Sequence, residues 1–421
     1  MTNRQLFLNH VGQTSEAPLA LEIIKAEGCK LFDADGKIYI DLIGGISVCN
    51  VGHRHPKVIE AIKKQVDDYL HIMVYGELVQ SPQVQYAKML VEHLPASLNS
   101  VFFTASGSEA TEGAMKLAKR FSGSTQIISF KNSYHGSTQG ALSVMGSEYW
   151  QQAFRPLLPD VLQMNYNAFE DLENITERTA CVIAETIQAE AGVLVPQNGW
   201  LKALRKKCDE TGTLLVLDEI QCGFGRNGTL WGFEQFDVVP DILLLGKALG
   251  GGMPLGAFIA DKKIMNALTH NPMLGHINTF GGHPVCCAAG LAAFNVLLDE
   301  KLIDAVKAKE NLFILLLKHP KIKAVRSCGL MMAVEFESFE MNKQVIDALL
   351  QGSGRPERPD PGVFTDWFLF AANCLRIVPP LTISEEEITV ACNKIIGVLD
   401  VLWNSGLNHK SCQVEAFIKK F

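Results

Sequence analysis

Apolar runs without any alternation dominate the middle of the chain. The runs "SVFFTA", "ACVIAE", "TLLVL" and "DILLL" carry mostly hydrophobic residues at successive positions. This pattern is typical of strands that are buried on both faces of a sheet. Between them lie helical patterns, the clearest of which places Ala110, Ala114, Leu117, Ala118 and Phe121 on one face. The succession of strand and helix patterns along the chain predicts an α/β fold with a largely parallel sheet covered by helices on both faces.

The two ends of the chain follow a different pattern. "CKLFDADGKIYIDLI" predicts two short strands around an Asp35-Gly36 turn, within an N-terminal arm. After about residue 292 the chain mixes helical patterns with short strands. We therefore expect residues 1–52 to form an arm and part of a small domain, residues 53–292 the large domain, and residues 293–421 the C-terminal small domain.

Two further patterns lie in the C-terminal part. "GSGRPERPDPG" is rich in Gly and Pro and predicts a surface loop. "TISEEEITVACNKIIGVLDVLW" predicts a late helix in which Ser384 is the N-cap and Glu387 completes a capping box. Because the three glutamates fit the start of a helix, they do not indicate a metal site.

Composition and charge argue against several classes of protein. The chain has 38 Lys and Arg against 45 Asp and Glu, so nothing favours nucleic acid or an anionic membrane as a partner. No apolar run approaches the roughly 20 residues that a membrane span needs. The 11 cysteines are scattered without a C-x-x-C pair, which favours reduced thiols and a cytoplasmic location. The histidines of "GHRHP" lack further ligands at a suitable spacing, and no metal site is predicted.

Charged side chains follow two of the predicted strands. Asp218 follows "TLLVL", and Lys247 follows "DILLLG". Because ligands bind at the carboxyl ends of parallel strands, both side chains can face one ligand. Taken alone, Asp218 also fits a turn or helix cap, and Lys247 also fits a solvated loop. Together they suit pyridoxal phosphate, which needs an amine to hold it as a Schiff base and an anion at its pyridine nitrogen.

Other strand ends offer groups for the same cofactor. Ser106, Gly107 and Ser108 lie between a predicted strand and a predicted helix, where exposed backbone N–H groups suit a phosphate. Tyr134 and His135 follow another strand, where an aromatic face could stack on a flat heterocycle. Each of these features alone also fits a turn or a core position.

At this point the chain resembles a known family. Seven segments, in the family's order, are similar to the class III, fold-type I pyridoxal phosphate aminotransferases, which include the acetylornithine, ornithine and 4-aminobutyrate enzymes. The resemblance spans about residues 17–403. It implies a mostly parallel seven-stranded sheet in the large domain and a small α+β domain built from both termini. The segments are "SGSEATEGAMKLAK", "YHGSTQGALSV", "ETIQAEAG", "LLVLDEIQCGFGRNG", "LLLGKALGGGMPLGA", "NTFGGHPVCCAAG" and "LRIVPPLTI".

The resemblance also implies roles for single residues. Lys247 is similar to the Schiff-base lysine that also moves the proton, and Asp218 to the partner of the pyridine nitrogen. Ile220 and Tyr134 would lie on opposite faces of the ring, with Gln221 near its phenolic oxygen. Cofactor binding is thereby expected at Ser106, Gly107, Ser108, Tyr134, His135, Asp218, Ile220, Gln221, Lys247 and Thr279.

Thr279 implies a dimer. In the family, the threonine of "NTFGG" reaches the phosphate bound by the neighbouring subunit, which here is Thr279. The resemblance therefore implies a homodimer in which each subunit contributes to the site of the other.

Substrate recognition is expected at three further positions. Glu190 and Arg376 resemble a pair in the ornithine and 4-aminobutyrate branch, whose arginine is released when a dicarboxylate such as 2-oxoglutarate enters. A structural salt bridge is the alternative. The chain departs from the family at Ser137, where "HGRT" enzymes have an arginine, and at Ile46, where ornithine aminotransferase offers a tyrosine. The donor is therefore left open among ω-amino acids, diamines and other amino acids.

The predicted function is transamination between an amino donor and a 2-oxo acid, 2-oxoglutarate being the expected acceptor. An aminomutase or decarboxylase on the same fold is the alternative, and a non-catalytic cofactor-binding protein is a second one. "GFGRNG", residues 223–228, fits G-x-G-x-x-G, but it lies mid-chain and continues as "TLWGFEQF" rather than as an apolar helix. A dinucleotide site is therefore not predicted.

Overall fold

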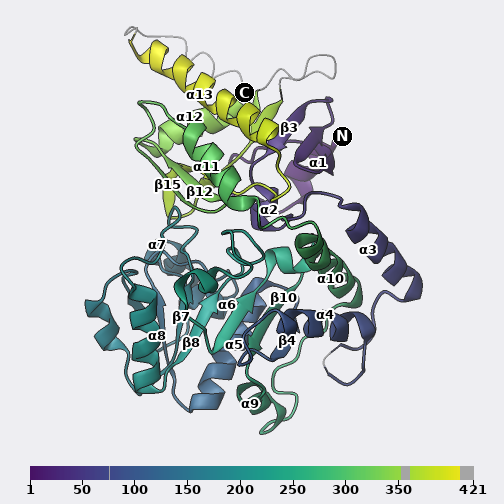
Figure 1. Ribbon diagram of the computed structural model, residues 1–421, viewed down its shortest axis with the longest axis vertical. Coiled ribbons are helices and arrows are strands. Elements are labelled where there is room, and N and C mark those ends of the chain that lie inside the picture. The colour runs from purple at the N-terminus through teal and green to yellow at the C-terminus, as the bar shows by residue number, and fades with distance from the viewer. Residues whose placement is uncertain (75, 352–360, 408–421) are drawn as a thin grey trace.

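The computed structural model describes residues 1–74, 76–351 and 361–407, with the side chains of 403–407 left aside. In Figure 1 a large sheet flanked by helices occupies the lower part of the view. The N-terminal strands and the C-terminal elements lie together in the upper part. The predicted Gly/Pro-rich loop falls almost wholly outside the described residues.

The large sheet has seven strands in the order β4-β10-β9-β8-β7-β5-β6. Neighbouring strands are parallel except β10, which is antiparallel to both β4 and β9. Every residue of β7, β8, β9 and β10 is buried, which confirms the interpretation of the continuous apolar runs. The strands are β4 (Ser100–Thr104), β5 (Gln126–Phe130), β6 (Val161–Met164), β7 (Thr179–Glu185), β8 (Leu214–Asp218), β9 (Ile242–Leu245) and β10 (Gly256–Ala260).

Helices cover both faces of this sheet. On β8, Leu217 belongs to the apolar cluster that contains Trp200 of α8 (Trp200–Thr211). The adjacent Val216 points the other way, into the cluster that contains Ala114 of α5 (Gly107–Ser122). Successive strand residues therefore pack against different helices, as expected for a doubly covered sheet. Phe121, predicted on the buried face of α5, is 40% exposed near the end of the helix.

The other helices of this half surround the sheet and its edges. Helix α10 packs against α3 and α4, as seen at the lower right of Figure 1. The boundary proposed at 292/293 falls within α10 and stays a prediction, as does the boundary at 52/53. These helices are α3 (Pro56–Asp68), α4 (Ser81–Glu92), α6 (Gln139–Ser143), α7 (Glu148–Gln151), α9 (Lys262–Met265) and α10 (Pro284–Asp299).

The small domain is built from both ends of the chain. One four-stranded sheet has the order β1-β2-β3-β13, in which β13 from the C-terminal part pairs in parallel with β3 from the N-terminal part. The predicted hairpin around Asp35 is confirmed as β2 and β3. The second sheet has the order β11-β12-β15-β14. The strands are β1 (Ile23–Glu27), β2 (Lys30–Asp33), β3 (Ile38–Asp41), β11 (Ala324–Cys328), β12 (Met331–Glu335), β13 (Gly362–Phe364), β14 (Trp367–Phe368) and β15 (Ala371–Ile377).

Local side-chain chemistry fixes where the last helix begins. The Ser384 hydroxyl accepts from the Glu387 N–H (3.1 Å), and the Glu387 carboxylate accepts from the Ser384 N–H (3.0 Å), which confirms the predicted capping box. None of the helices in the described part of the chain is long and apolar enough to cross a membrane. The small-domain and N-terminal helices are α1 (Asn3–His10), α2 (Gly44–Ser47), α11 (Val306–Leu316), α12 (Phe339–Leu350) and α13 (Glu385–Leu407).

Candidate active site

A cavity of about 190 Å³ opens at the carboxyl edge of the large sheet. Strands β8, β9, β5 and β4 each end beside it, so residues far apart in sequence meet there. Nearly all of the residues predicted to bind a cofactor line this cavity. The lining residues are Ser106, Gly107, Ser108, Tyr134, His135, Gly136, Glu185, Ile187, Asp218, Ile220, Gln221, Cys222 and Lys247.

Asp218 is held in one orientation at the end of β8. One carboxylate oxygen lies 2.7 Å from Nδ1 of His135, and the other accepts the backbone N–H of Ile220 at 2.9 Å. Both Asp218 and His135 are buried. Buried carboxylates need such partners, because an unpaired charge is costly away from water. The Nε2 atom of His135 is buried and has no hydrogen-bond partner in the described chain.

Lys247 begins the 3-10 turn η4 (Lys247–Gly250), with one residue between it and the end of β9. Its φ of +48° lies in the left-handed region, which is a strained conformation for a residue with a side chain. Its amine donates to the side-chain oxygen of Gln221 at 3.0 Å. Burial lowers the pKa of the Lys247 amine; Glu190 opposes this effect and Arg376 adds to it. A lysine with a lowered pKa is more readily deprotonated and can act as a nucleophile or base.

The Ser-Gly-Ser segment forms the start of α5. Ser106 is the N-cap, and its hydroxyl accepts the N–H of Glu109 at 3.2 Å. A Cβ at Gly107 would lie 2.9 Å from Cδ1 of Ile220, so any larger residue there would force the Ile220 side chain to shift. The helix therefore presents its N-terminus, with unpaired N–H groups and the positive end of its dipole, to the cavity.

These groups fit pyridoxal phosphate. The cavity combines an amine, an oriented carboxylate and a helix N-terminus suited to a phosphate. Two buried polar atoms on its wall, Nε2 of His135 and Nε2 of Gln221, have no partner among the described residues. Buried polar groups normally have a partner, so both atoms favour a polar ligand in the cavity.

Glu185 lines the cavity but was not singled out from the sequence. It is the register partner of Asp218 across β7 and β8. Burial raises the pKa of Glu185 to about 7; His135 counteracts this rise and Asp218 adds to it. Its carboxylate accepts the N–H groups of Tyr134 and Ala189, both at 3.0 Å, and so fixes the backbone that carries Tyr134. The available signal in the sequence was that the apolar strand run "ACVIAE" ends on this glutamate.

Glu190 and Arg376 form a buried bidentate ion pair. Both N–O distances are 2.7 Å, and the guanidinium also donates to the Trp367 carbonyl at 2.8 Å. Burial raises the pKa of Glu190, but the charge and hydrogen bonds of Arg376 outweigh this and leave the pKa below its usual value. The guanidinium carbon lies 4.5 Å from the ring centroid of Phe368. Such a pair is costly to bury and is well suited to exchange one carboxylate for another.

Neither Glu190 nor Arg376 lines the cavity, and neither do three other positions that the sequence singled out, Thr279, Ile46 and Ser137. Thr279 is exposed and does not line the cavity of its own chain. Ile46 has a φ of +63° and is 37% exposed on α2, which packs against η4. Ser137 follows Gly136, which lines the cavity, and its hydroxyl is 3.1 Å from that of Tyr134.

Comparisons with known proteins identify a family whose chemistry fits this site. The family model described as "Aminotransferase class-III" matches residues 11–399. Acetylornithine aminotransferase of Methanopyrus kandleri is 39% identical over 395 residues, covering 93% of this chain and 96% of that protein. The enzyme of the same name from Methanocaldococcus jannaschii is 38% identical, covering 90% of this chain and 93% of that protein.

Solved structures give the same result. Ornithine aminotransferase of Toxoplasma gondii, crystallised with partial occupancy of PLP at its active site, is 30% identical with a TM-score of 0.86, covering 95% of this chain and 94% of that one. An (S)-enantioselective omega-transaminase from Thermomicrobium roseum is 27% identical with a TM-score of 0.85, covering 94% of this chain and 97% of that one. The chain belongs to the class III aminotransferases and is a pyridoxal phosphate-dependent aminotransferase.

Proposed function

We propose that this enzyme transfers the amino group of an amine-bearing donor to 2-oxoglutarate, with Lys247 and Asp218 as the central pair. The observation that carries the acceptor assignment is the buried Glu190–Arg376 pair, which is close enough to Lys247 to influence its pKa. An arginine at that place suits the carboxylate next to a reacting carbon.

Lys247 has two tasks in this proposal. Bound in the cavity, pyridoxal phosphate would supply an aldehyde for amines and a ring that accepts electrons from the substrate carbon. The Lys247 amine would hold the cofactor covalently between turnovers and, once displaced by the donor, would move the proton at the substrate carbon. Its lowered pKa supports both tasks, because only the neutral amine attacks a carbonyl or accepts a proton.

The remaining groups would hold and polarise the ring. Asp218, oriented by His135, would keep the pyridine nitrogen protonated. The start of α5, with Gly107 and Ser108, would bind the phosphate. Tyr134 and Ile220 would lie on opposite ring faces, and Gln221 would face the phenolic oxygen.

Arg376 would bind the acceptor, and Glu190 would act as a gate. When a donor without a carboxylate beside its amine occupies the site, Glu190 neutralises the guanidinium. When a 2-oxo acid enters, its carboxylate replaces Glu190 as the partner of Arg376. One pocket can then accept both substrates in turn, because the arginine is never left buried without a counter-charge.

The donor is the open part of this proposal. The two relatives from Methanopyrus kandleri and Methanocaldococcus jannaschii cited above are named acetylornithine aminotransferases. This chain has Ser137, with its hydroxyl near that of Tyr134, where the "HGRT" motif of the family would place a carboxylate-binding arginine. We therefore propose an ω-amino acid, a diamine or another amino acid whose far end is read without a cation at position 137.

A donor and acceptor screen tests this assignment. The enzyme is loaded with pyridoxal phosphate and offered amines in turn, with 2-oxoglutarate present, and glutamate formation is measured. We expect glutamate from at least one ω-amine, at a rate that exceeds the acetylornithine rate. Release of carbon dioxide or an isomerised amine without glutamate would instead favour the decarboxylase or aminomutase alternative. No turnover with any amine would contradict the proposal.

We also propose a homodimer in which Thr279 serves the partner's site. The segment around Thr279 exposes apolar side chains, with Ile277 46% and Phe280 56% exposed. The ring of Phe280 lies 5.1 Å from that of His71, beside a second segment with exposed apolar residues. Exposed apolar groups gathered on one side are typical of a protein interface.

Co-expression of two impaired variants, measured at limiting cofactor, tests that arrangement. Lys247→Ala disables its own site, and Thr279→Ala is expected to weaken cofactor binding about tenfold or more by removing a charged hydrogen bond. If Thr279 acts across the interface, mixed dimers hold one intact site, and about a quarter of wild-type activity returns at limiting cofactor. If activity stays at the level of the two variants measured separately, the threonine acts within its own chain or not at all.

We propose a cytoplasmic location because the cysteines are free thiols. The ten cysteines in the described part of the chain are all free thiols. Most of them are buried, and burial raises the pKa of several, including Cys181 and Cys208, to about 12. Such thiols persist most readily in a reducing compartment.

A further inference from the structure

Arg226 lies in the "GFGRNG" segment and is completely buried, with 0% of its surface exposed. Its guanidinium donates to the carbonyl oxygens of Leu330 (3.1 Å) and Pro379 and to the side-chain oxygen of Asn50. All three acceptors are neutral, and no Asp or Glu in the described part of the chain forms an ion pair with it. A buried cation held only by neutral oxygens is unusual and needs a reason.

Burial also affects the protonation of this side chain. It lowers the pKa of Arg226 to about 9, so the guanidinium stays charged at neutral pH at a cost. Its Nε atom is also buried without a hydrogen-bond partner in the described chain. An apolar residue would avoid both penalties but would leave the oxygens of Leu330, Pro379 and Asn50 without this donor, so the arginine has a role that an apolar residue cannot fill.

The three acceptors come from three separate parts of the chain. Asn50 follows α2, Leu330 precedes β12, and Pro379 follows β15. Backbone hydrogen bonds reinforce the junction: the Leu330 N–H donates to the Arg226 carbonyl (2.9 Å), and the Leu381 N–H donates to the Asn50 carbonyl (2.8 Å). Arg226 thus joins the cofactor-binding half of the molecule to both segments that form the small domain.

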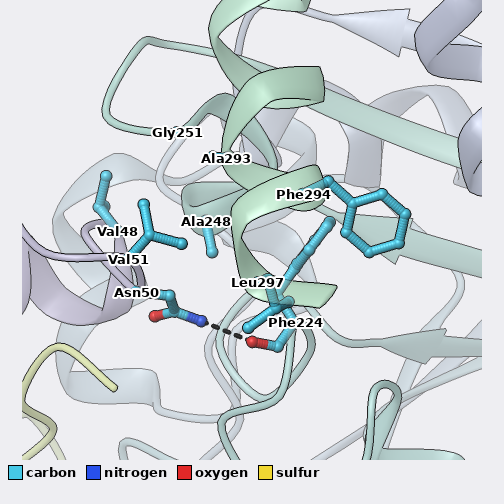
Figure 2. A pocket seen from close by; sticks show the side chains of 9 residues that line it. All are labelled: Val48, Asn50, Val51, Phe224, Ala248, Gly251, Ala293, Phe294 and Leu297. Atoms are coloured by element: carbon cyan, nitrogen blue, oxygen red, sulfur yellow. Dashed lines mark hydrogen bonds between the residues drawn. The ribbon is translucent and has the colours of Figure 1, made fainter. Parts of the chain in front are cut away.

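The junction is tightly packed. Figure 2 shows Asn50 donating its side-chain N–H to the Phe224 carbonyl (2.9 Å), beside a cavity of about 10 Å³, room for about one water molecule. Ala248, which follows Lys247 directly, lies on the same cavity. A dense junction transmits displacements instead of absorbing them. The cavity is lined by Val48, Asn50, Val51, Phe224, Ala248, Gly251, Ala293, Phe294 and Leu297.

Short stretches of chain connect Arg226 to Gln221, the partner of Lys247, and to Arg376. On one side, Gln221, which accepts the hydrogen bond of Lys247, lies in the same loop after β8. On the other side, Pro379 lies just beyond Arg376 on the run that leaves β15. We infer that Arg226 is a positioning residue that sets Arg376 at the correct distance from Lys247, and so determines affinity for the carboxylate of the 2-oxo acid.

The geometry explains why this residue is an arginine. A guanidinium is a rigid planar fork with five N–H donors, which can hold acceptors on three segments at once. Lysine offers a single flexible ammonium and cannot fix all three. The inference rests on the proposed role of Arg376 as the carboxylate-binding group.

Arg226→Lys tests the inference in the cofactor-loaded enzyme. Glutarate, an unreactive dicarboxylate, is titrated calorimetrically. We expect binding about tenfold weaker than in the wild type, because displacements well below 1 Å already weaken a bidentate contact. The absorption spectrum and retention of the cofactor should not change, since Arg226 does not line the cofactor cavity. Hydrogen exchange should accelerate in residues 371–381.

A matched variant separates positioning from stability. Arg205→Lys alters another poorly exposed arginine, on α8, which pairs with Asp241 at 2.7 Å away from the junction. It should lower thermal stability without changing glutarate affinity. If Arg226→Lys also lowers only thermal stability, Arg226 is merely structural and the inference is wrong.

Two further variants keep the test decisive. If Arg226→Lys does not fold, Asn50→Ala is measured in its place. It removes one acceptor of Arg226 and should also weaken glutarate binding. An unchanged glutarate affinity would overturn the inference. Arg376→Ala is measured in parallel. If Arg376→Ala leaves glutarate binding intact, the proposed acceptor site itself is wrong. If it weakens binding and Arg226→Lys does not, only the positioning inference fails.

Discussion

Replacing Lys247 by alanine is expected to lower the rate of amino transfer by about 10⁴-fold or more, at the upper end of what a positioned acid–base group contributes. The cofactor should stay bound, because Asp218 and the start of α5 would contact other parts of it, but it should now be removable by dialysis. The measurement is a single turnover: enzyme loaded with pyridoxamine phosphate is mixed with 2-oxoglutarate, and the absorption spectrum is followed. This form of the assay needs no knowledge of the donor.

Two variants serve as controls for Lys247. Lys247→Arg keeps the positive charge but stays protonated, so it should be as inactive as the alanine variant. Lys206→Ala removes a lysine that is 78% exposed on α8 and should behave as wild type. A Lys247→Ala enzyme that turns over within tenfold of the wild type would show that another group moves the proton.

Replacing Arg376 by alanine is expected to weaken 2-oxoglutarate binding about 10- to 100-fold. This loss corresponds to the binding free energy of one or two hydrogen bonds between charged groups. The reaction of the pyridoxal form with a simple primary amine should change far less, because that substrate has no carboxylate for Arg376. The two half-reactions are measured separately by stopped-flow absorbance. Equal losses in both half-reactions would contradict the assignment of Arg376 to the acid.

Glu190 supplies the complementary variant. Glu190→Gln removes the charge that competes for Arg376, so 2-oxoglutarate should bind several-fold more tightly, while simple amines should react more slowly beside an uncompensated guanidinium. The double variant, with Arg376→Ala, leaves no buried unpaired charge and separates the loss of recognition from the loss of stability. If Glu190→Gln weakens 2-oxoglutarate binding, the pair is a structural salt bridge and not a gate.

Much of the fold was readable from local patterns. Continuous apolar runs become β7, β8 and β9, buried on both faces, because a strand covered by helices on both sides has no polar side. The Ser384 capping box depends on only four consecutive residues, so it too was predictable. The placement of Asp218 and Lys247 beside one cavity followed from one rule, that the carboxyl ends of parallel strands share an edge.

Other features needed contacts between distant parts of the chain. Glu185 lies beside Asp218 only because of the register of β7 and β8. The sequence does not show that β13 would join β3 or that β10 would run antiparallel to its neighbours. Pairings of this kind depend on long-range contacts.

The sequence by itself determined the family, the α/β architecture and most of the chemical groups that face the cofactor cavity, since these follow from residue type and from position within a strand or helix. Only the tertiary structure decided which partner each group has: His135 for Asp218, Gln221 for Lys247, and neutral oxygens for Arg226. The physical reason is that a hydrogen bond or a pKa shift depends on distances of a few ångströms, and those distances are set by segments that the sequence separates by up to 176 positions.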